Sequence, residues 1–193
     1  MSRLIPLFSV LLLLSSAADA HVTGGLAGGF TSGLLHPVLG LDHVVAMVGV
    51  GLWGAFLGYP AIWILPVVFP LVMTLGGALG IMGVPMFAIE PGIAMSAVVL
   101  GLMVAFTVRA PIWFAAVIVG FFAIFHGYAH GAELPEAANP LAFSLGFVIS
   151  TGLLHLAGIA LGTLTRWKNG LRVVRSGGAV ITAVGLGFLA GVF

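Results

Sequence analysis

Six long apolar runs follow one another along this 193-residue chain, separated by short segments that hold proline, glycine and most of the charged residues. The runs cover about residues 41–58, 60–82, 90–108, 111–130, 140–164 and 174–193. A helix needs about 20 apolar residues to cross the hydrocarbon core of a bilayer. Only 6% of the residues are charged, whereas soluble domains have about 25%. The sequence therefore predicts an all-α, polytopic membrane helix bundle with about six transmembrane helices.

The first 20 residues, MSRLIPLFSVLLLLSSAADA, have the pattern of a secretory signal peptide. Arg3 precedes a short leucine-rich core, and Ala18 and Ala20 occupy the small-residue positions of an A-x-A cleavage site. An uncleaved first transmembrane helix is the alternative, but this apolar run is shorter than a membrane span. We expect residues 1–20 to be removed, leaving residues 21–193 as a single transmembrane helical domain. His21 would then offer a free α-amine and an imidazole, which together can chelate a metal.

Residues 24–36, GGLAGGFTSGLLH, are too few and too rich in glycine to span a bilayer alone. They form either a half-helix buried among the other helices or an extension of the first span that bends at Pro37. We expect the half-helix, because irregular backbone is tolerated at membrane depth only where protein or a water-filled cavity borders it. Small residues four apart, such as Gly76 with Gly80, predict close packing between helices.

The distribution of charge predicts the orientation of the chain in the membrane. With His21 outside and six spans, Arg109 and the basic segment at 166–175 fall on the cytoplasmic side, where Lys and Arg accumulate. The acidic loop at 130–140 then lies outside. We therefore expect a multi-pass protein of the bacterial inner membrane with its mature amino terminus in the periplasm. Five aromatic residues near span ends are expected to be interfacial anchors: Trp53, Tyr59, Trp63, Trp113 and Trp167.

Composition also narrows the classes of ligand. The net charge is +1 and the chain has no basic patch for phosphate, so nucleic acid is not an expected partner. The chain has no cysteine, so any metal must be bound mainly by nitrogen and oxygen. No nucleotide-binding motif is present and we expect no organic cofactor. The expected partners are a divalent metal ion and the lipid bilayer, and the sequence leaves a homo-oligomer or partner subunits open.

Histidines and carboxylates stand out in this apolar background, because an ionisable side chain at the centre of a membrane costs about 2.5 kcal/mol or more. They gather in three segments: HPVLGLDH at 36–43, FHGYAHGAE at 125–133 and TGLLHLAG at 151–158. A lone histidine in an apolar helix is commonly a core residue bonded to a carbonyl, and for His155 alone that alternative stays open. The clustering of five histidines with two carboxylates favours a functional site.

Helical spacing brings the polar side chains of the second segment together. His126 and His130 are four residues apart and Glu133 follows three later, so all three project from one side of a helix. Two imidazoles and a carboxylate form a partial ligand shell for Ni²⁺, Co²⁺, Zn²⁺ or Cu²⁺.

In the first segment, His36 and His43 share a face only if the helix continues through Pro37. Asp42 either binds the metal directly or holds His43 in the right tautomer. Met47 offers a sulfur atom, although methionine in a helix is usually packing material, and Glu90 is expected to mark the start of a span. The candidate metal ligands are therefore His21, His36, Asp42, His43, His126, His130, Glu133 and His155.

Three stretches, HPVLGLDHVVAMVGVGLWG, FHGYAHGAE and LLHLAGIALG, occur in this order behind the signal segment and resemble the HupE/UreJ family of bacterial membrane proteins. The resemblance covers nearly the whole mature chain. It implies a permease for nickel, or for cobalt, that supplies hydrogenase, urease or cobalamin assembly. The family motifs fall on these positions: His36, Asp42, His43, His126, His130, Glu133 and His155.

Three functional classes remain open. A permease for Ni²⁺ or Co²⁺ explains ligands at several depths, and it is the function we expect, with no enzymatic activity. The alternative is an intramembrane metal-dependent hydrolase, in which three ligands hold the metal and a carboxylate activates water. Haem binding would instead require two histidines at matched depth that face one another.

Overall fold

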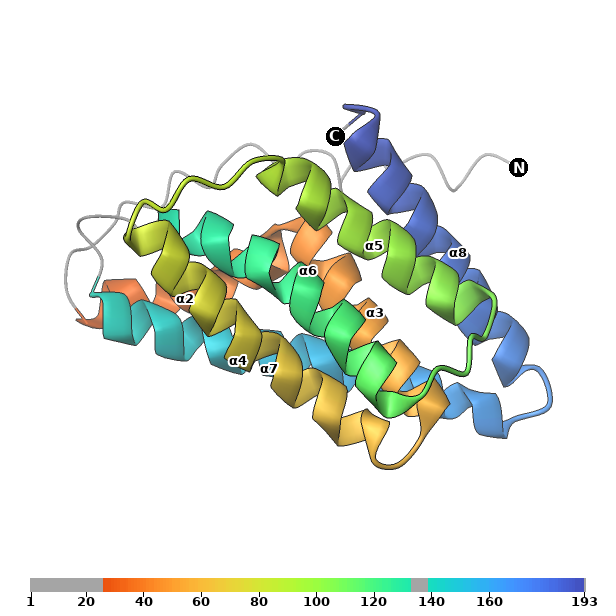
Figure 1. Ribbon diagram of the computed structural model, residues 1–193. Helices are drawn as coiled ribbons and strands as arrows, with labels where there is room; N and C mark the ends of the chain where they lie inside the picture. Colours follow the sequence, from red (N-terminus) through yellow and green to blue (C-terminus); the bar gives the residue numbers. More distant parts are fainter. Residues whose placement is uncertain (1–25, 133–138, 193) are drawn as a thin grey trace, which may run out of the picture.

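The computed structural model describes residues 26–132 and 139–192, which fold into a bundle of helices (Figure 1). The helices are α2 (Leu26–Leu39), α3 (Leu41–Leu57), α4 (Ala61–Ile81), α5 (Ile89–Ala105), α6 (Ile112–Ala132), α7 (Pro140–Gly162), η2 (Thr163–Arg166) and α8 (Gly170–Leu189). This part of the chain contains no strand. The predicted all-α architecture is therefore confirmed, whereas the predicted signal peptide at 1–20 lies outside the described residues.

The six predicted spans correspond to the six helices α3 to α8. Four of them, α4, α6, α7 with η2, and α8, are individually long and apolar enough to cross a bilayer. Helices α3 and α5 have 17 residues each, and α3 passes the same test only together with α2, to which it is joined at an angle of 76°. The bundle therefore offers four complete spans, or five if the bent pair counts as one.

The outer faces of the long helices are apolar, as a bilayer requires. Val67, Leu71 and Leu75 of α4 are more than half exposed, and Val117 and Phe121 of α6 are exposed to the same degree. Soluble monomers rarely expose several large apolar side chains side by side on one helix face. We therefore treat these faces as lipid-facing.

Four of the five expected aromatic anchors are exposed at one end of the bundle: Tyr59, Trp63, Trp113 and Trp167. The expectation for Trp53 is wrong. Its side chain is fully buried in α3, and its indole Nε1 donates a hydrogen bond to the carbonyl oxygen of Val108 at 3.0 Å. The acceptor lies in the loop between α5 and α6, which folds over the end of α3.

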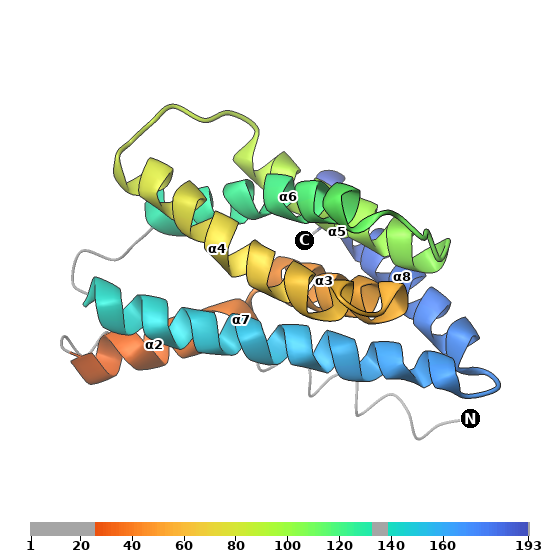
Figure 2. The ribbon, with the colours of Figure 1, turned by 60° about the horizontal axis from the view of Figure 1, so that its bottom comes forward.

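Helix α2 runs along the first half of α7, and α3 packs against the second half (Figure 2). The expected short helix is therefore present, but it is not buried among the other helices, because its residues Leu35, Val38 and Leu39 are exposed. The alternative bend at Pro37 is not observed, because Pro37 lies inside α2 and the helix ends only at Leu39. The break is at Gly40, whose backbone is extended, with φ −84° and ψ 109°.

Glycines let the helices approach at backbone distance. A side chain on Gly127 or Gly131 of α6 would collide with backbone atoms of Met73 or Gly77 in α4. The predicted small-residue contact at Gly76 is part of this interface, because a side chain there would collide with Ile124. Close contact on this face of α6 turns the neighbouring residues His126 and His130 toward the rest of the bundle.

Charged residues lie at opposite ends of the bundle. All the described basic residues lie in the loops and helix ends where α5 and α7 finish and α8 begins: Arg109, Arg166, Lys168, Arg172 and Arg175. The described carboxylates, Asp42 and Glu90, lie in the first turns of α3 and α5 at the other end. We call these the basic end and the acidic end.

Candidate metal site

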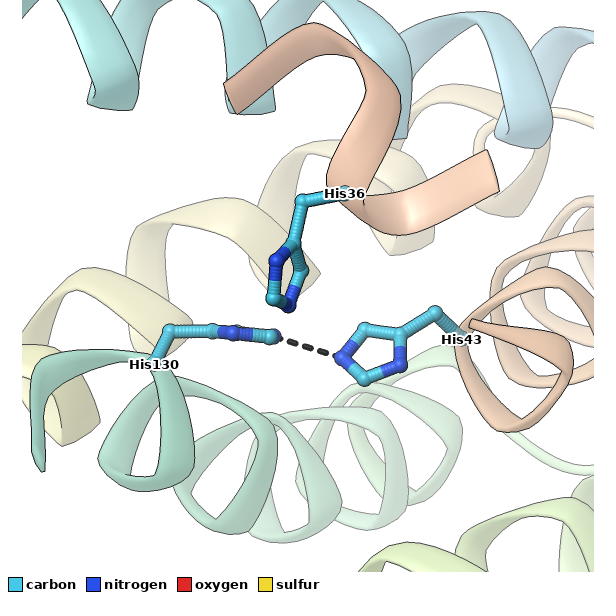
Figure 3. Close-up of side chains that lie close together, drawn as sticks. All are labelled: His36, His43 and His130. Carbon is cyan, nitrogen blue, oxygen red and sulfur yellow. Dashed lines mark hydrogen bonds between the residues drawn. The ribbon is translucent and has the colours of Figure 1, made fainter. Parts of the chain in front are cut away.

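Three histidines from three helices converge near the acidic end (Figure 3). His36 comes from the last turn of α2, His43 from the first turn of α3, and His130 from the last turn of α6. One ring nitrogen of each lies within 4.8 Å of the other two. We call this group the three-histidine cluster.

The break at Gly40 positions two members of this cluster. Because α2 and α3 meet at 76°, His36 and His43 face one another across the bend, with ring centroids 5.9 Å apart. The imidazole of His130 approaches from α6, with its centroid 4.9 Å from that of His36 and 4.6 Å from that of His43. Phe143 and Phe147 of α7 contact the ring of His36 from the other side.

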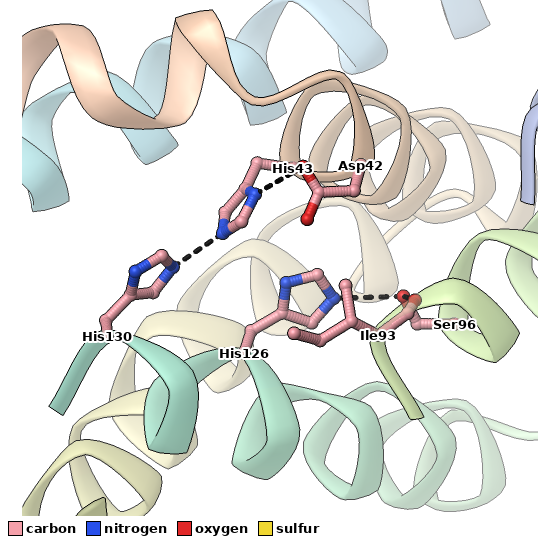
Figure 4. Close-up of polar contacts among 6 residues, drawn as sticks. All are labelled: Asp42, His43, Ile93, Ser96, His126 and His130. Atoms are coloured by element: carbon pink, nitrogen blue, oxygen red, sulfur yellow. Dashed lines mark hydrogen bonds and ion pairs between the residues drawn. The ribbon is translucent and has the colours of Figure 1, made fainter. Parts of the chain in front are cut away.

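Asp42 orients His43. Its Oδ1 lies 2.8 Å from Nδ1 of His43, and Nε2 of His43 lies 2.6 Å from Nε2 of His130 (Figure 4). A carboxylate can only accept, so this contact favours a proton on Nδ1 of His43 and a lone pair on Nε2 of the neutral ring, although its angle falls outside the range of a hydrogen bond. This favours the second of the two roles considered for Asp42, that of holding the tautomer rather than binding the metal.

The spacing of these nitrogens is close to that of ligands on one metal ion. Two nitrogens on one ion, each about 2.0–2.1 Å from it, lie about 2.9–3.4 Å apart in octahedral or tetrahedral geometry. The 2.6 Å between His43 and His130 is about 0.3–0.8 Å shorter, and the three nitrogens lie within 4.8 Å of one another, so small movements of the rings would let them share one ion. The donor set of three imidazoles suits nickel, cobalt, zinc or copper.

His126 lies next to His43 but outside the three-histidine cluster. Its ring is fully buried, with its centroid 5.3 Å from that of His43. Its Nε2 lies 2.9 Å from the hydroxyl of Ser96 on α5, while its Nδ1 has no hydrogen-bond partner among the described residues.

His155 lies apart from the cluster, behind an aromatic ring. The fully buried ring of Phe69 contacts His126 at 5.4 Å and His155 at 5.6 Å between centroids. Both ring nitrogens of His155 and the hydroxyl of Thr151, one turn earlier on α7, are buried without a hydrogen-bond partner in the described part of the chain. The alternative of a core histidine bonded to a carbonyl therefore finds no support here.

A cavity of about 300 Å³ opens beside Asp42 at the acidic end. It is lined by Asp42 and Glu90, together with apolar residues of α5 and the end of α8. Glu90 starts a helix, as expected, but its position beside the same cavity as Asp42 could not be predicted from the sequence. This arrangement requires α5 to pack beside α3, which is a tertiary relationship.

Two of the candidate ligands, His21 and Glu133, lie outside the described residues. Met47, considered as a sulfur ligand, is fully buried in the apolar core. The sequence motifs do not include Ser96, although a lone hydroxyl within an apolar helix is the kind of signal that marks an intramembrane polar contact.

Two comparisons of this sequence with known proteins agree with one another. Residues 9–188 match the model of the family described as HupE / UreJ protein. Protein HupE from Rhizobium leguminosarum bv. viciae is 45% identical over 180 residues, which cover 93% of this chain and 94% of that relative. No solved structure matches the chain.

Proposed function

The chain belongs to the HupE/UreJ family, and on that premise we propose that it is a permease for Ni²⁺, or for Co²⁺, in the bacterial inner membrane. In this role it supplies the metal to metalloenzyme assembly. The observation that carries the proposal is the three-histidine cluster, formed at the bend between two helices in a bundle with lipid-facing sides.

The donor atoms support a borderline transition metal as the substrate. The cluster offers three imidazole nitrogens, and the chain has no cysteine that would favour a softer ion. Imidazole suits nickel, cobalt, zinc and copper alike, so competition among these ions decides the substrate.

Ligands at successive depths support transport rather than storage. His130 and His126 lie on one face of α6, one turn or about 6 Å apart along the helix axis. Beyond His126 lies the ring of Phe69, and beyond that ring lies His155. A permease must bind its ion tightly enough to admit it and weakly enough to release it, which a series of sites achieves.

The charges support a direction of movement. Asp42 and Glu90 line a cavity at the acidic end, where two carboxylates raise the local concentration of a divalent cation. The basic residues lie at the opposite end, which the positive-inside rule assigns to the cytoplasm. We infer that the metal enters from the periplasmic side at the acidic end, where the sequence also places His21 and Glu133 as ligands.

Uptake of radiolabelled Ni²⁺ into proteoliposomes tests this proposal, with unlabelled Co²⁺ and Zn²⁺ as competitors. We expect saturable uptake that His43→Gln abolishes, because Nε2 of His43 is central to the cluster. Gly177→Ala is the matched control, because a side chain at that position meets nothing within 4 Å. Uptake by the His43→Gln variant at the wild-type rate would refute the proposal.

The alternative function, a metal-dependent hydrolase, is favoured by one observation. Three imidazoles on one ion, with a fourth position open for water, form the ligand set of some catalytic zinc sites. Such an enzyme also needs a carboxylate to activate the water, and Asp42 is already directed to His43. Zinc-dependent hydrolysis of a peptide or ester library by the purified protein, without ion uptake, would establish this alternative.

Haem binding between His43 and His130 is disfavoured by geometry. Their Nε2 atoms are 2.6 Å apart, which leaves no room for a macrocycle between the two rings.

A further inference from the structure

The hydroxyl of Ser96 makes two contacts inside the bundle (Figure 4). It lies 2.6 Å from the carbonyl oxygen of Ile93, one turn earlier on α5. It also lies 2.9 Å from Nε2 of His126 on α6. Both Ser96 and His126 are completely buried, so neither side chain can exchange these partners for bulk water.

These two contacts determine where the protons lie. A hydroxyl has one proton to donate, and a carbonyl oxygen can only accept. The proton of Ser96 is therefore donated to Ile93, and Nε2 of His126 must donate its own proton to the oxygen of Ser96. The neutral ring of His126 then carries no proton on Nδ1.

The lone pair on Nδ1 of His126 has no hydrogen-bond partner among the described residues. The ring stands nearly perpendicular to that of His43, at an interplanar angle of 87° and a centroid distance of 5.3 Å. A buried acceptor without a partner is costly, and an imidazole lone pair is the group that binds a transition metal. His126 can therefore bind a metal ion through Nδ1, whereas His43 offers Nε2.

We propose that Ser96 is a positioning residue, which fixes the Nε2-protonated tautomer of His126 so that Nδ1 receives the metal ion one helical turn beyond the three-histidine cluster. This inference rests on the proposed permease function and extends it. Ser96 does for His126 what Asp42 does for His43, but with the opposite ring nitrogen exposed. The ion would thus pass from Nε2 of His43 in the cluster to Nδ1 of His126.

Two substitutions of His126 distinguish a ligand from a structural partner. The amide of Gln reaches the place of Nε2, so His126→Gln keeps a donor for Ser96 and loses the ligand atom. The amide of Asn reaches the place of Nδ1, so His126→Asn keeps an oxygen ligand and loses the bond to Ser96. We expect Ni²⁺ uptake to be abolished in His126→Gln and partly retained in His126→Asn. The reverse order would overturn the inference.

Ser96→Ala tests the positioning role directly. Loss of a partner that orients a metal-binding histidine weakens metal binding or activity about 10–100-fold, and we expect Ni²⁺ uptake to fall by that factor. Thr182→Val is the matched control, because Thr182 on α8 also donates to a carbonyl of its own helix, at 2.9 Å from Gly178, but has no histidine partner. Uptake within about threefold of wild type in Ser96→Ala would overturn the role.

Nitrogen NMR of ¹⁵N-histidine-labelled protein in nanodiscs supplies a readout that a purely structural role would not change. We expect His126, assigned by the signal missing in His126→Gln, to be protonated on Nε2 and to shift at Nδ1 when Zn²⁺ is added. In Ser96→Ala we expect both tautomers. An Nδ1 signal that Zn²⁺ leaves unchanged would overturn the inference, even where His36 and His43 shift and the permease proposal stands. A wild-type protein that shows no metal response at any histidine would refute both.

Discussion

The bend at Gly40 offers the sharpest test of how the cluster is built. A side-chain carbon placed on Gly40 would lie 2.8 Å from Nδ1 of His43 and 2.9 Å from Oδ1 of Asp42, whereas ordinary contacts are 3.4–4 Å. In Gly40→Ala, both atoms must therefore retreat by at least about 0.5 Å to restore van der Waals contact. They are the two atoms that hold His43 in its tautomer.

The expected effect is on metal binding rather than on folding. Displacing a carboxylate that orients a metal-binding histidine costs about 10–100-fold in affinity, which corresponds to about 1.4–2.8 kcal/mol. The fold should persist, because the backbone angles at Gly40 are open to any residue. The atoms in the way also belong to side chains and not to a neighbouring helix.

Isothermal titration of the detergent-solubilised protein with Ni²⁺ measures this effect. We expect the Kd of Gly40→Ala to rise at least about tenfold over wild type, with Gly177→Ala unchanged because its added carbon meets nothing within 4 Å. An unchanged Kd in Gly40→Ala, with normal accumulation in the membrane, would show that the Asp42–His43 pair does not support the site.

Three further outcomes follow from the same geometry. Asp42→Asn should lower Ni²⁺ uptake at least about tenfold at normal protein levels, and loss of the protein from the membrane with normal uptake by the remainder would instead indicate a structural role. Uptake should weaken as the pH is lowered, because protons compete with the metal for imidazole nitrogens; uptake that increases on acidification would contradict imidazole ligation as the step that limits transport. Gly51→Ala should lower the Tm, because its side chain would collide with the carbonyl oxygen of His155, whereas Gly152→Ala, with nothing within 4 Å, should not.

Much of the fold could be predicted from the sequence because apolar length is a strong signal. The predicted span at 60–82 is α4 at Ala61–Ile81, and the predicted span at 111–130 is α6 at Ile112–Ala132. Helical spacing also placed His126 and His130 on one side of α6. In each case the prediction needed only local information.

Tertiary contacts explain what the sequence did not reveal. Trp53 was assigned to the membrane interface, but the carbonyl of Val108, 55 residues away, lies where its indole can donate to it. Ser96 acquires its role from a histidine 30 residues away. A bend at Pro37 was the alternative to the expected half-helix, yet Pro37 fits within α2, and the chain turns instead at Gly40, beside the side chains of Asp42 and His43.

The bend also explains why the histidine spacing alone could not predict the site. On a straight helix, residues seven apart share a face but lie about 10.5 Å apart along the axis, too far for one ion to bind both. The 76° angle at Gly40 reduces the separation of the His36 and His43 rings to 5.9 Å. The bend thereby brings His36 and His43 together, and His130 from α6 completes the cluster. Discontinuous helices of this kind form the substrate sites of many transporters, and here the discontinuity itself brings the candidate ligands together.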